Sequence, residues 1–203
     1  MGVYELSGAG SLKTPRTVYS SMNAGNQYGA MVPIASVDMG GTNSANFTNI
    51  PQTYQDLFVV YQTRNAQATS GLAQFWCWLN GTQDTSNGLC SFTTLSGNGS
   101  AVNTGRNSNT NQIEIGFSVN ANATAGVFGT GTVHILNYTN TTTNKTLLSR
   151  AAADLNGSGT TELVAGLFRS TAAVTALYFR ADGGATQSAG SRVTLYGIRA
   201  VSS

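Results

Sequence analysis

The chain has 203 residues, of which 9% are charged and 40% hydrophobic, and its formal net charge is +2. In an average soluble domain about 25% of residues are charged, so the polar character here comes from Thr, Ser, Asn and 24 Gly. This small, scattered charge argues against nucleic acid or an anionic membrane as a partner.

The length fits one undivided β domain. The first residues lack the basic start and apolar core of a secretory signal, and no apolar run approaches the length of a transmembrane span. The sequence therefore predicts a protein that is made in a cytoplasm and stays soluble.

Residues 1–49 are loosely patterned, with a short apolar start, Gly- and Asn-rich stretches and a weak strand at 31–37. We interpret them as an N-terminal arm with an inserted loop. Two readings stay open: the arm docks on a neighbouring protein, or it is an ordinary surface excursion.

A second region, residues 50–203, starts with the clearest strand signal in the chain. After Pro51 and a polar corner, residues 57–64 are rich in β-branched and aromatic types. Leu57, Val59 and Tyr61 point to one face, and Phe58 and Val60 to the other. A strand that is apolar on both faces is expected to be covered on both sides.

Further strands follow at short, regular spacing, without an amphipathic helix; they are expected at 73–79, 89–95, 113–119, 127–138, 145–153, 162–168, 174–180 and 192–201. Residues 96–112 are polar and predict an exposed loop. This pattern predicts an all-β fold, an antiparallel jelly-roll-like β-sandwich of about eight strands with an N-terminal arm.

Little in the chain predicts chemistry, so we expect no enzyme, catalytic residue, cofactor or metal site. His134, the only histidine, lies in a strand and is expected to pack or to bond across strands. Cys77 and Cys90 are too few for a disulfide framework and, with one histidine, for a zinc site. They are interpreted as two buried thiols, although a hairpin could place them opposite each other.

Apolar residues on both faces of several strands exceed what a monomeric sandwich needs. We therefore expect a homo-oligomer, most simply a trimer. The residues proposed for its interfaces are mainly aromatic: Tyr4, Leu6, Tyr61, Trp76, Trp78, Tyr178 and Tyr196. Trp76 and Trp78 could instead stack on sugar rings.

Several segments resemble a family of tailed-bacteriophage virion proteins. The resemblance covers about residues 47–201, and its residues are Tyr4-Glu5-Leu6 before a Gly/Ser-rich turn, Asn49 to Leu57, the Asn80-Gly81 turn, Val133 to Tyr138, Ala165 to Val174 and Thr194 to Ile198. It implies a jelly-roll module on the outside of a phage particle, as a head decoration or cement protein, a head fibre or a tail-fibre module.

The chain lacks the repeats that build a fibre shaft. The sequence therefore favours a compact, trimeric capsid decoration or cement protein that binds the major capsid protein and stabilises the head. The alternative is a tail- or head-fibre adhesin that recognises host-surface carbohydrate through loops such as residues 96–111.

Overall fold

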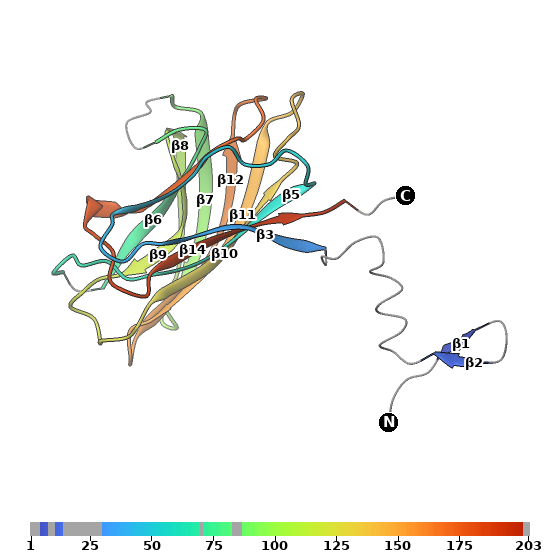
Figure 1. The fold of residues 1–203 in the computed structure, drawn as a ribbon. Coiled ribbons are helices and arrows are strands. Elements are labelled where there is room, and N and C mark those ends of the chain that lie inside the picture. Colours follow the sequence, from blue (N-terminus) through green and yellow to red (C-terminus); the bar gives the residue numbers. More distant parts are fainter. Residues whose placement is uncertain (1–4, 8–10, 14–29, 70, 83–86, 201–203) are drawn as a thin grey trace.

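The structure, a computed structural model, describes residues 5–7, 11–13, 30–69, 71–82 and 87–200. Apart from one 3₁₀ turn, η1 (Asp182–Gly184), the regular structure of these residues is all β. Two antiparallel sheets face each other as a sandwich (Figure 1). The predicted all-β sandwich is confirmed.

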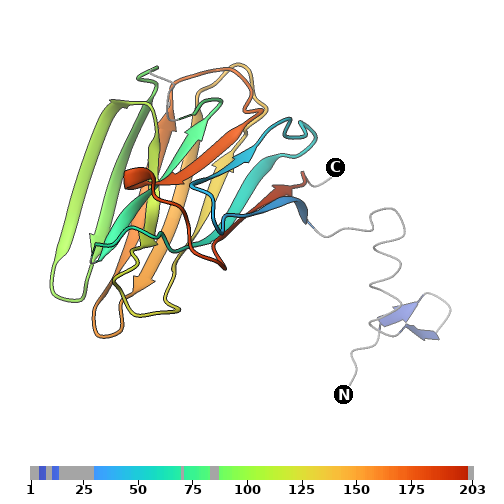
Figure 2. The same cartoon turned by 60° about the vertical axis from the view of Figure 1, so that its left-hand side comes forward.

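The larger sheet has eight strands, in the spatial order β3 (Met31–Asp38), β14 (Arg192–Ile198), β5 (Asp56–Thr63), β10 (Gly129–Leu136), β11 (Lys145–Asp154), β12 (Gly159–Phe168), β7 (Cys90–Gly97) and β8 (Val102–Thr110). The smaller sheet has the order β4 (Ser44–Phe47), β13 (Leu177–Ala181), β6 (Leu72–Leu79) and β9 (Ile113–Val119). The two layers can be followed in Figure 2. A third, two-stranded sheet pairs β1 (Glu5–Ser7) with β2 (Ser11–Lys13).

The core lies between the two sheets and is built on alternation. Along β5, Leu57, Val59 and Tyr61 are buried, as expected, and pack against the smaller sheet. The ring of Phe75 on β6 lies 4.9 Å from that of Tyr61 and 6.3 Å from that of Phe179 on β13, measured between centroids. Aromatic contacts of this kind add to the free energy gained by burying apolar area.

The sandwich contains more strands than the eight expected, and β8 is one reason. The polar segment predicted as a loop at residues 96–112 instead pairs with β7 as a regular strand. Most of its side chains are exposed because β8 is the outermost strand of the larger sheet. A strand without a buried face carries no alternation of apolar and polar residues, so its sequence looked like a loop.

The start of the sandwich also differs from the expected boundary at residue 49. β3 pairs with β14 in the larger sheet, and β4 pairs with β13 in the smaller sheet. Residues 31–47 therefore contribute one strand to each sheet of the sandwich. The side chain of Phe47 is buried against Phe179. The part of the expected arm at residues 14–29 lies outside the described residues. The described part of the chain contains no helix of the length and apolar character that crossing a bilayer would require.

Candidate functional site

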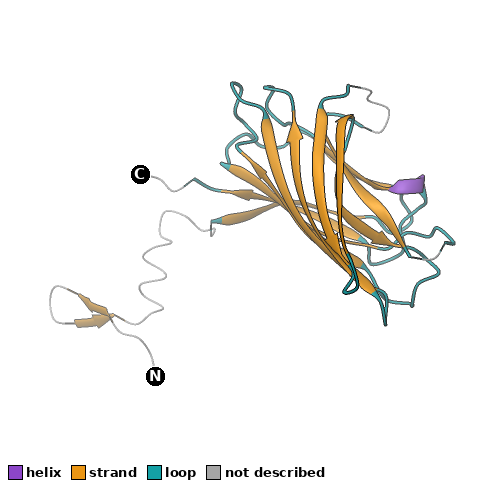
Figure 3. Ribbon diagram, turned by 180° about the vertical axis from the view of Figure 1, so that it is seen from behind, coloured by secondary structure: helices purple, strands orange, loops and turns teal. Residues whose placement is uncertain are grey.

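The side of the eight-stranded sheet that is turned away from the smaller sheet is called the outer face here. Figure 3, seen from behind, brings its long strands to the front. Its side chains are the residues of each strand that alternate with the core residues. Strand pairing places them in rows across the sheet, because directly paired residues project on the same side.

Two rows cross the middle of the outer face. One runs through Thr194, Val60, Thr132, Arg150, Leu163, Leu95 and Thr104. The next runs through Tyr196, Phe58, His134, Leu148, Ala165, Thr93 and Arg106. Neither row contains an acidic residue.

Exposed apolar side chains gather on this face. Six large hydrophobic side chains of the described chain are exposed, and all six belong to the outer face: Met31, Val60, Leu95, Val102, Leu148 and Leu163. Leu148 is 55% and Leu163 51% exposed, on neighbouring strands. Contiguous patches of exposed apolar groups on a folded protein often mark an interaction surface.

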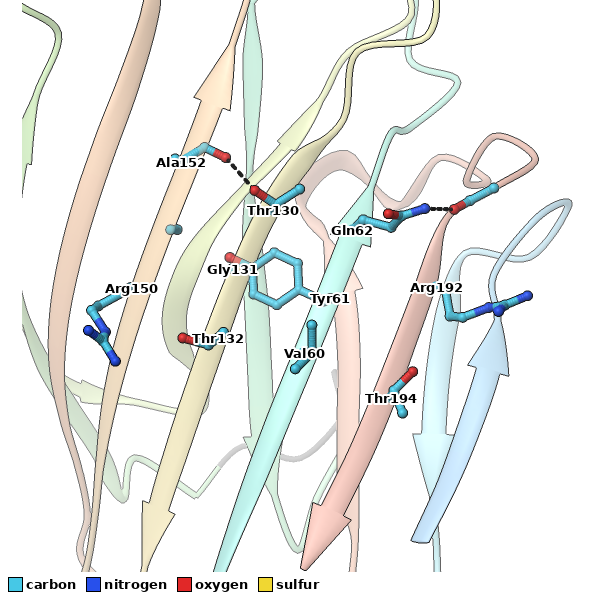
Figure 4. A pocket seen from close by; sticks show the side chains of 12 residues that line it. Val60, Tyr61, Gln62, Thr130, Gly131, Thr132, Arg150, Ala152, Arg192 and Thr194 are labelled. Atoms are coloured by element: carbon cyan, nitrogen blue, oxygen red, sulfur yellow. Dashed lines mark hydrogen bonds between the residues drawn. The ribbon is translucent and has the colours of Figure 1, made fainter. Parts of the chain in front are cut away.

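Arg150 lines three of the shallow hollows on the outer face. Their volumes are about 680, 430 and 470 Å³. Figure 4 shows the largest, with Arg150 on β11 at one side, Arg192 on β14 at the other, and Val60 and Thr132 between them. The other two hollows lie around Leu163 and Leu95. The outer face is therefore an uneven surface with a cation at its centre.

The charges on the outer face divide into paired and unpaired groups. His134 Nε2 lies 2.9 Å from Asp56 Oδ2, so the expected cross-strand bond of this histidine is present. The other carboxylate oxygen of Asp56 accepts the backbone N–H of Asn137. Arg192 lies 3.7 Å from Asp38. Among the described residues Arg150 has no hydrogen-bond or ion-pair partner, and this leaves a free cation among leucines.

Other basic side chains are used inside the fold. Arg64 is 8% exposed and donates hydrogen bonds to four backbone carbonyls of the loop before β10, those of Ala121, Ala123, Thr124 and Val127. Lys145 is buried, and its Nζ donates to three carbonyls, including that of Thr143 at 2.8 Å. Their positive charges are satisfied by carbonyl dipoles and do not reach a ligand surface.

Two carboxyl groups are buried on the strands of the sandwich. Glu162 on β12 is 5% exposed, and its Oε2 atom has no hydrogen-bond partner. Burial is the main cause that raises the pKa of Glu162 to about 8, and the nearby charge of Glu114 adds to it. Burial raises the pKa of Glu114 to about 7, although a hydrogen bond from Gln74 opposes this shift. No three His, Cys, Asp or Glu side chains of the described chain are grouped so that they could hold a metal ion.

The aromatic residues predicted for interfaces do not form one surface. Tyr61 is a core residue: it is 2% exposed, and its hydroxyl donates to the carbonyl of Ile115, so it cannot face a neighbouring copy. Trp78 is 5% exposed, on the outward side of the smaller sheet, and its ring lies 5.3 Å from that of Tyr178. Trp76 is half-buried, packed 6.0 Å from Phe92.

Tyr196 is the one described member of that set on the outer face, where it is half-buried and pairs with Phe58. Tyr4 and the side chain of Leu6 lie outside the described residues. Cys77 and Cys90 are free and buried, as interpreted, and they come from different sheets instead of one hairpin. Burial raises the pKa of the Cys90 thiol to about 12, so it is inert as a nucleophile near neutral pH.

The sequence pattern missed the centre of the outer face. Leu95, Leu148, Arg150 and Leu163 were assigned to strands but not to a surface. The signal for one of them was present in the Leu147-Leu148 pair, since neighbouring strand residues point to opposite faces. Aromatic residues drew the prediction because they are common at interfaces, but here most of them fill the interior.

The fold and surface define an antiparallel β-sandwich in which one sheet face carries the large hydrophobic side chains that are exposed in the described chain. No known family model, curated protein or solved structure matches the chain. The resemblance to phage virion proteins therefore stays a prediction.

Proposed function

We propose that this chain is a structural protein of a bacteriophage particle, a homo-oligomer, most simply a trimer, that sits on the particle exterior. In this proposal it is a capsid decoration or cement protein that binds the major capsid protein or other virion proteins. It acts by covering and bridging surfaces, not by catalysis.

One observation carries the proposal: every large apolar side chain that is exposed in the described chain lies on the same sheet face. Burial of apolar surface contributes about 25 cal/mol per Å². A protein that gathers its exposed leucines and valines on one face can gain this free energy by association. The residue pattern shared with phage virion proteins and the low content of charged residues agree with such a role.

No observation favours the adhesin alternative. The segment at residues 96–111 that was expected to present a recognition loop mostly forms β8. The two tryptophans expected to stack on sugars are buried or packed against the core. The aromatic side chains of the two central rows, Phe58 and Tyr196, are half-buried, whereas sugar rings pack best against exposed aromatic faces.

The proposal is tested on purified particles of the phage that carries the gene. Quantitative mass spectrometry is expected to find this chain in a fixed molar ratio to the major capsid protein after extensive purification. A replication protein of the same phage serves as the control and is expected to be absent. Absence of the chain from purified particles would refute the virion role.

A further inference from the structure

We propose that the outer face around Arg150 binds the N-terminal segment of a second copy of this chain, with Glu5 supplying a carboxylate to Arg150. This inference rests on the proposed oligomer and names the contact that holds it together. It starts from the electrostatics of one side chain.

Arg150 decides what kind of surface can cover the outer face. Its register neighbour on β12 is Leu163, and Leu148 lies two residues away on its own strand. A partner that covers these leucines also removes Arg150 from water. A buried cation without a counter-charge is strongly unfavourable. Backbone carbonyls can also satisfy a buried cation, as they do for Arg64, but a carboxylate forms the stronger, charge-assisted pair with a guanidinium group. We therefore expect the covering surface to present a carboxylate among apolar groups.

The same face of a second copy does not meet this requirement. The two central rows contain no acidic residue, and the acids near them already have partners. Asp56 is bonded to His134 and to the backbone of Asn137. Asp38 is the neighbour of Arg192. Two outer faces brought together would place unpaired arginines in a common apolar contact.

The N-terminal segment has the required composition. Glu5 is the only acidic residue before Asp38, and it stands between Tyr4 and Leu6. Of the remaining acidic residues in the described chain, Glu114 and Glu162 are buried, Asp154 accepts the backbone N–H of Asn156, and Asp182 is exposed on η1 beside β6 of the smaller sheet. In an extended segment Tyr4 and Leu6 project on the side opposite to Glu5, so the segment can offer a carboxylate on one side and large apolar groups on the other.

Topology and chain length also favour this occupant. β1 and β2 pair with each other and join neither sheet of the sandwich. A two-stranded hairpin is marginally stable alone and gains stability from packing on another surface. Residues 14–29 separate it from the sandwich, and 16 residues can span up to about 50 Å when extended. This reach is enough for the segment to cross to a neighbouring copy.

A charge exchange tests the contact in the full-length chain. Arg150→Glu and Glu5→Arg are each expected to weaken self-association at least tenfold, measured by sedimentation velocity over a concentration series. The double variant Arg150→Glu/Glu5→Arg is expected to recover it, because the pair is restored with its signs reversed. Arg106→Glu, on the edge strand of the same face, is the matched control and is expected to keep the wild-type mass. Urea unfolding checks that each variant folds.

The outcomes separate this inference from the proposed function. A wild-type oligomer that survives Arg150→Glu overturns the site and leaves the oligomer intact. Loss of assembly with Arg150→Glu but not with Glu5→Arg overturns the N-terminal segment as occupant and points to a carboxylate on another protein. If the wild-type chain stays monomeric and Glu5→Arg makes the N-terminal segment more sensitive to protease, the segment binds the outer face of its own chain. That result overturns a second copy as the source of the segment.

Discussion

At the scale of single residues, the fold depends on basic side chains that hold loops by their carbonyl oxygens. Arg64 follows β5 and donates to four carbonyls between residues 121 and 127. The guanidinium group suits this role because its five N–H donors lie in a fixed plane and its charge is never lost. The conformation of the loop between β9 and β10 is therefore held by a side chain that lies outside the loop.

Replacement of Arg64 by Met should destabilise the protein by about 1–3 kcal/mol, since four partly buried carbonyls would lose their donors. Urea unfolding at pH 7 measures this change. Arg106→Met is the matched control, because Arg106 is exposed on the edge strand β8; a change within about 0.5 kcal/mol is expected. Equal effects of the two substitutions would contradict the role assigned to Arg64.

Stability should also fall as the pH rises, because of Glu162. Its pKa is about 8 in the folded protein and 4.5 when unperturbed, so between these values the folded state holds a proton that the unfolded state releases. The stabilising contribution is complete below about pH 4.5 and is lost as the pH approaches 8. Glu162→Gln should remove this part of the pH dependence and make the variant more stable than wild type at pH 9 by a few kcal/mol.

Urea unfolding at pH 5, 7 and 9 gives the two profiles. In the Glu162→Gln variant a smaller decrease of stability with pH is expected to remain, because the pKa of Glu114 is also raised, to about 7. Asp154→Asn, at an exposed position at the end of β11, is the control and should leave the slope unchanged. A wild-type protein that gains stability between pH 5 and 9 would contradict the assignment.

At the scale of elements, the two sheets pack against each other where β9 passes over β10, β11 and β12, next to Tyr61 of β5. A Cβ atom at Gly131 would overlap the buried ring of Tyr61, and one at Gly116 would overlap both Tyr61 and Ala151. These glycines leave the space that the tyrosine ring fills. The close approach of the sheets here depends on the missing side chains, not on turn geometry.

Gly131→Ala should therefore destabilise the sandwich by about 1–3 kcal/mol, because the tyrosine ring has to move in a packed core. Thermal unfolding followed by circular dichroism measures the effect. Gly97→Ala, on β7, is the matched control, since its added Cβ would stand 3.6 Å from the carbonyl of Ala101, an ordinary contact. A loss of stability no larger than that of the control would show that the space between the two sheets at Gly131 tolerates a side chain.

Periodicity in the sequence predicted the strands that have one buried face. β5, β6, β11 and β12 all lie within a few residues of their expected ranges, because burial imposes alternation on them. β9 also matches its expected range, although both of its faces are buried. β8 was missed because it is exposed on both sides, and β3 was expected only as a weak strand because it lies at the other edge of the sheet. Edge strands carry less of the core and hence less of its pattern.

The candidate site was less predictable than the fold. The expectation of apolar groups on both faces of β5 was correct for the positions of Phe58 and Val60. It did not reveal which strands bring their outer residues together, since β11, β12 and β7 are joined by pairing between distant segments. Aromatic content also misled, because it does not distinguish a residue such as Tyr61 from a surface residue.

At the scale of the whole molecule, the larger sheet is covered by the smaller sheet on one side only. The smaller sheet buries the inner side of the larger sheet, and the outer face keeps Leu148, Leu163 and Leu95 in contact with water. An association that covers this face would bury apolar groups on both partners. The central claim is that the working protein is an assembly in which the outer face is covered.

The mass of the full-length chain at micromolar concentration, measured by sedimentation equilibrium, tests that claim most directly. The account predicts a mass of three chains for wild type, and of one chain for Leu148→Ser/Leu163→Ser at the same concentration. Val102→Ser, which removes an exposed apolar group at the edge of the sheet, should retain the assembly. A wild-type mass of one chain, or an assembly that persists when both leucines are replaced, would contradict it.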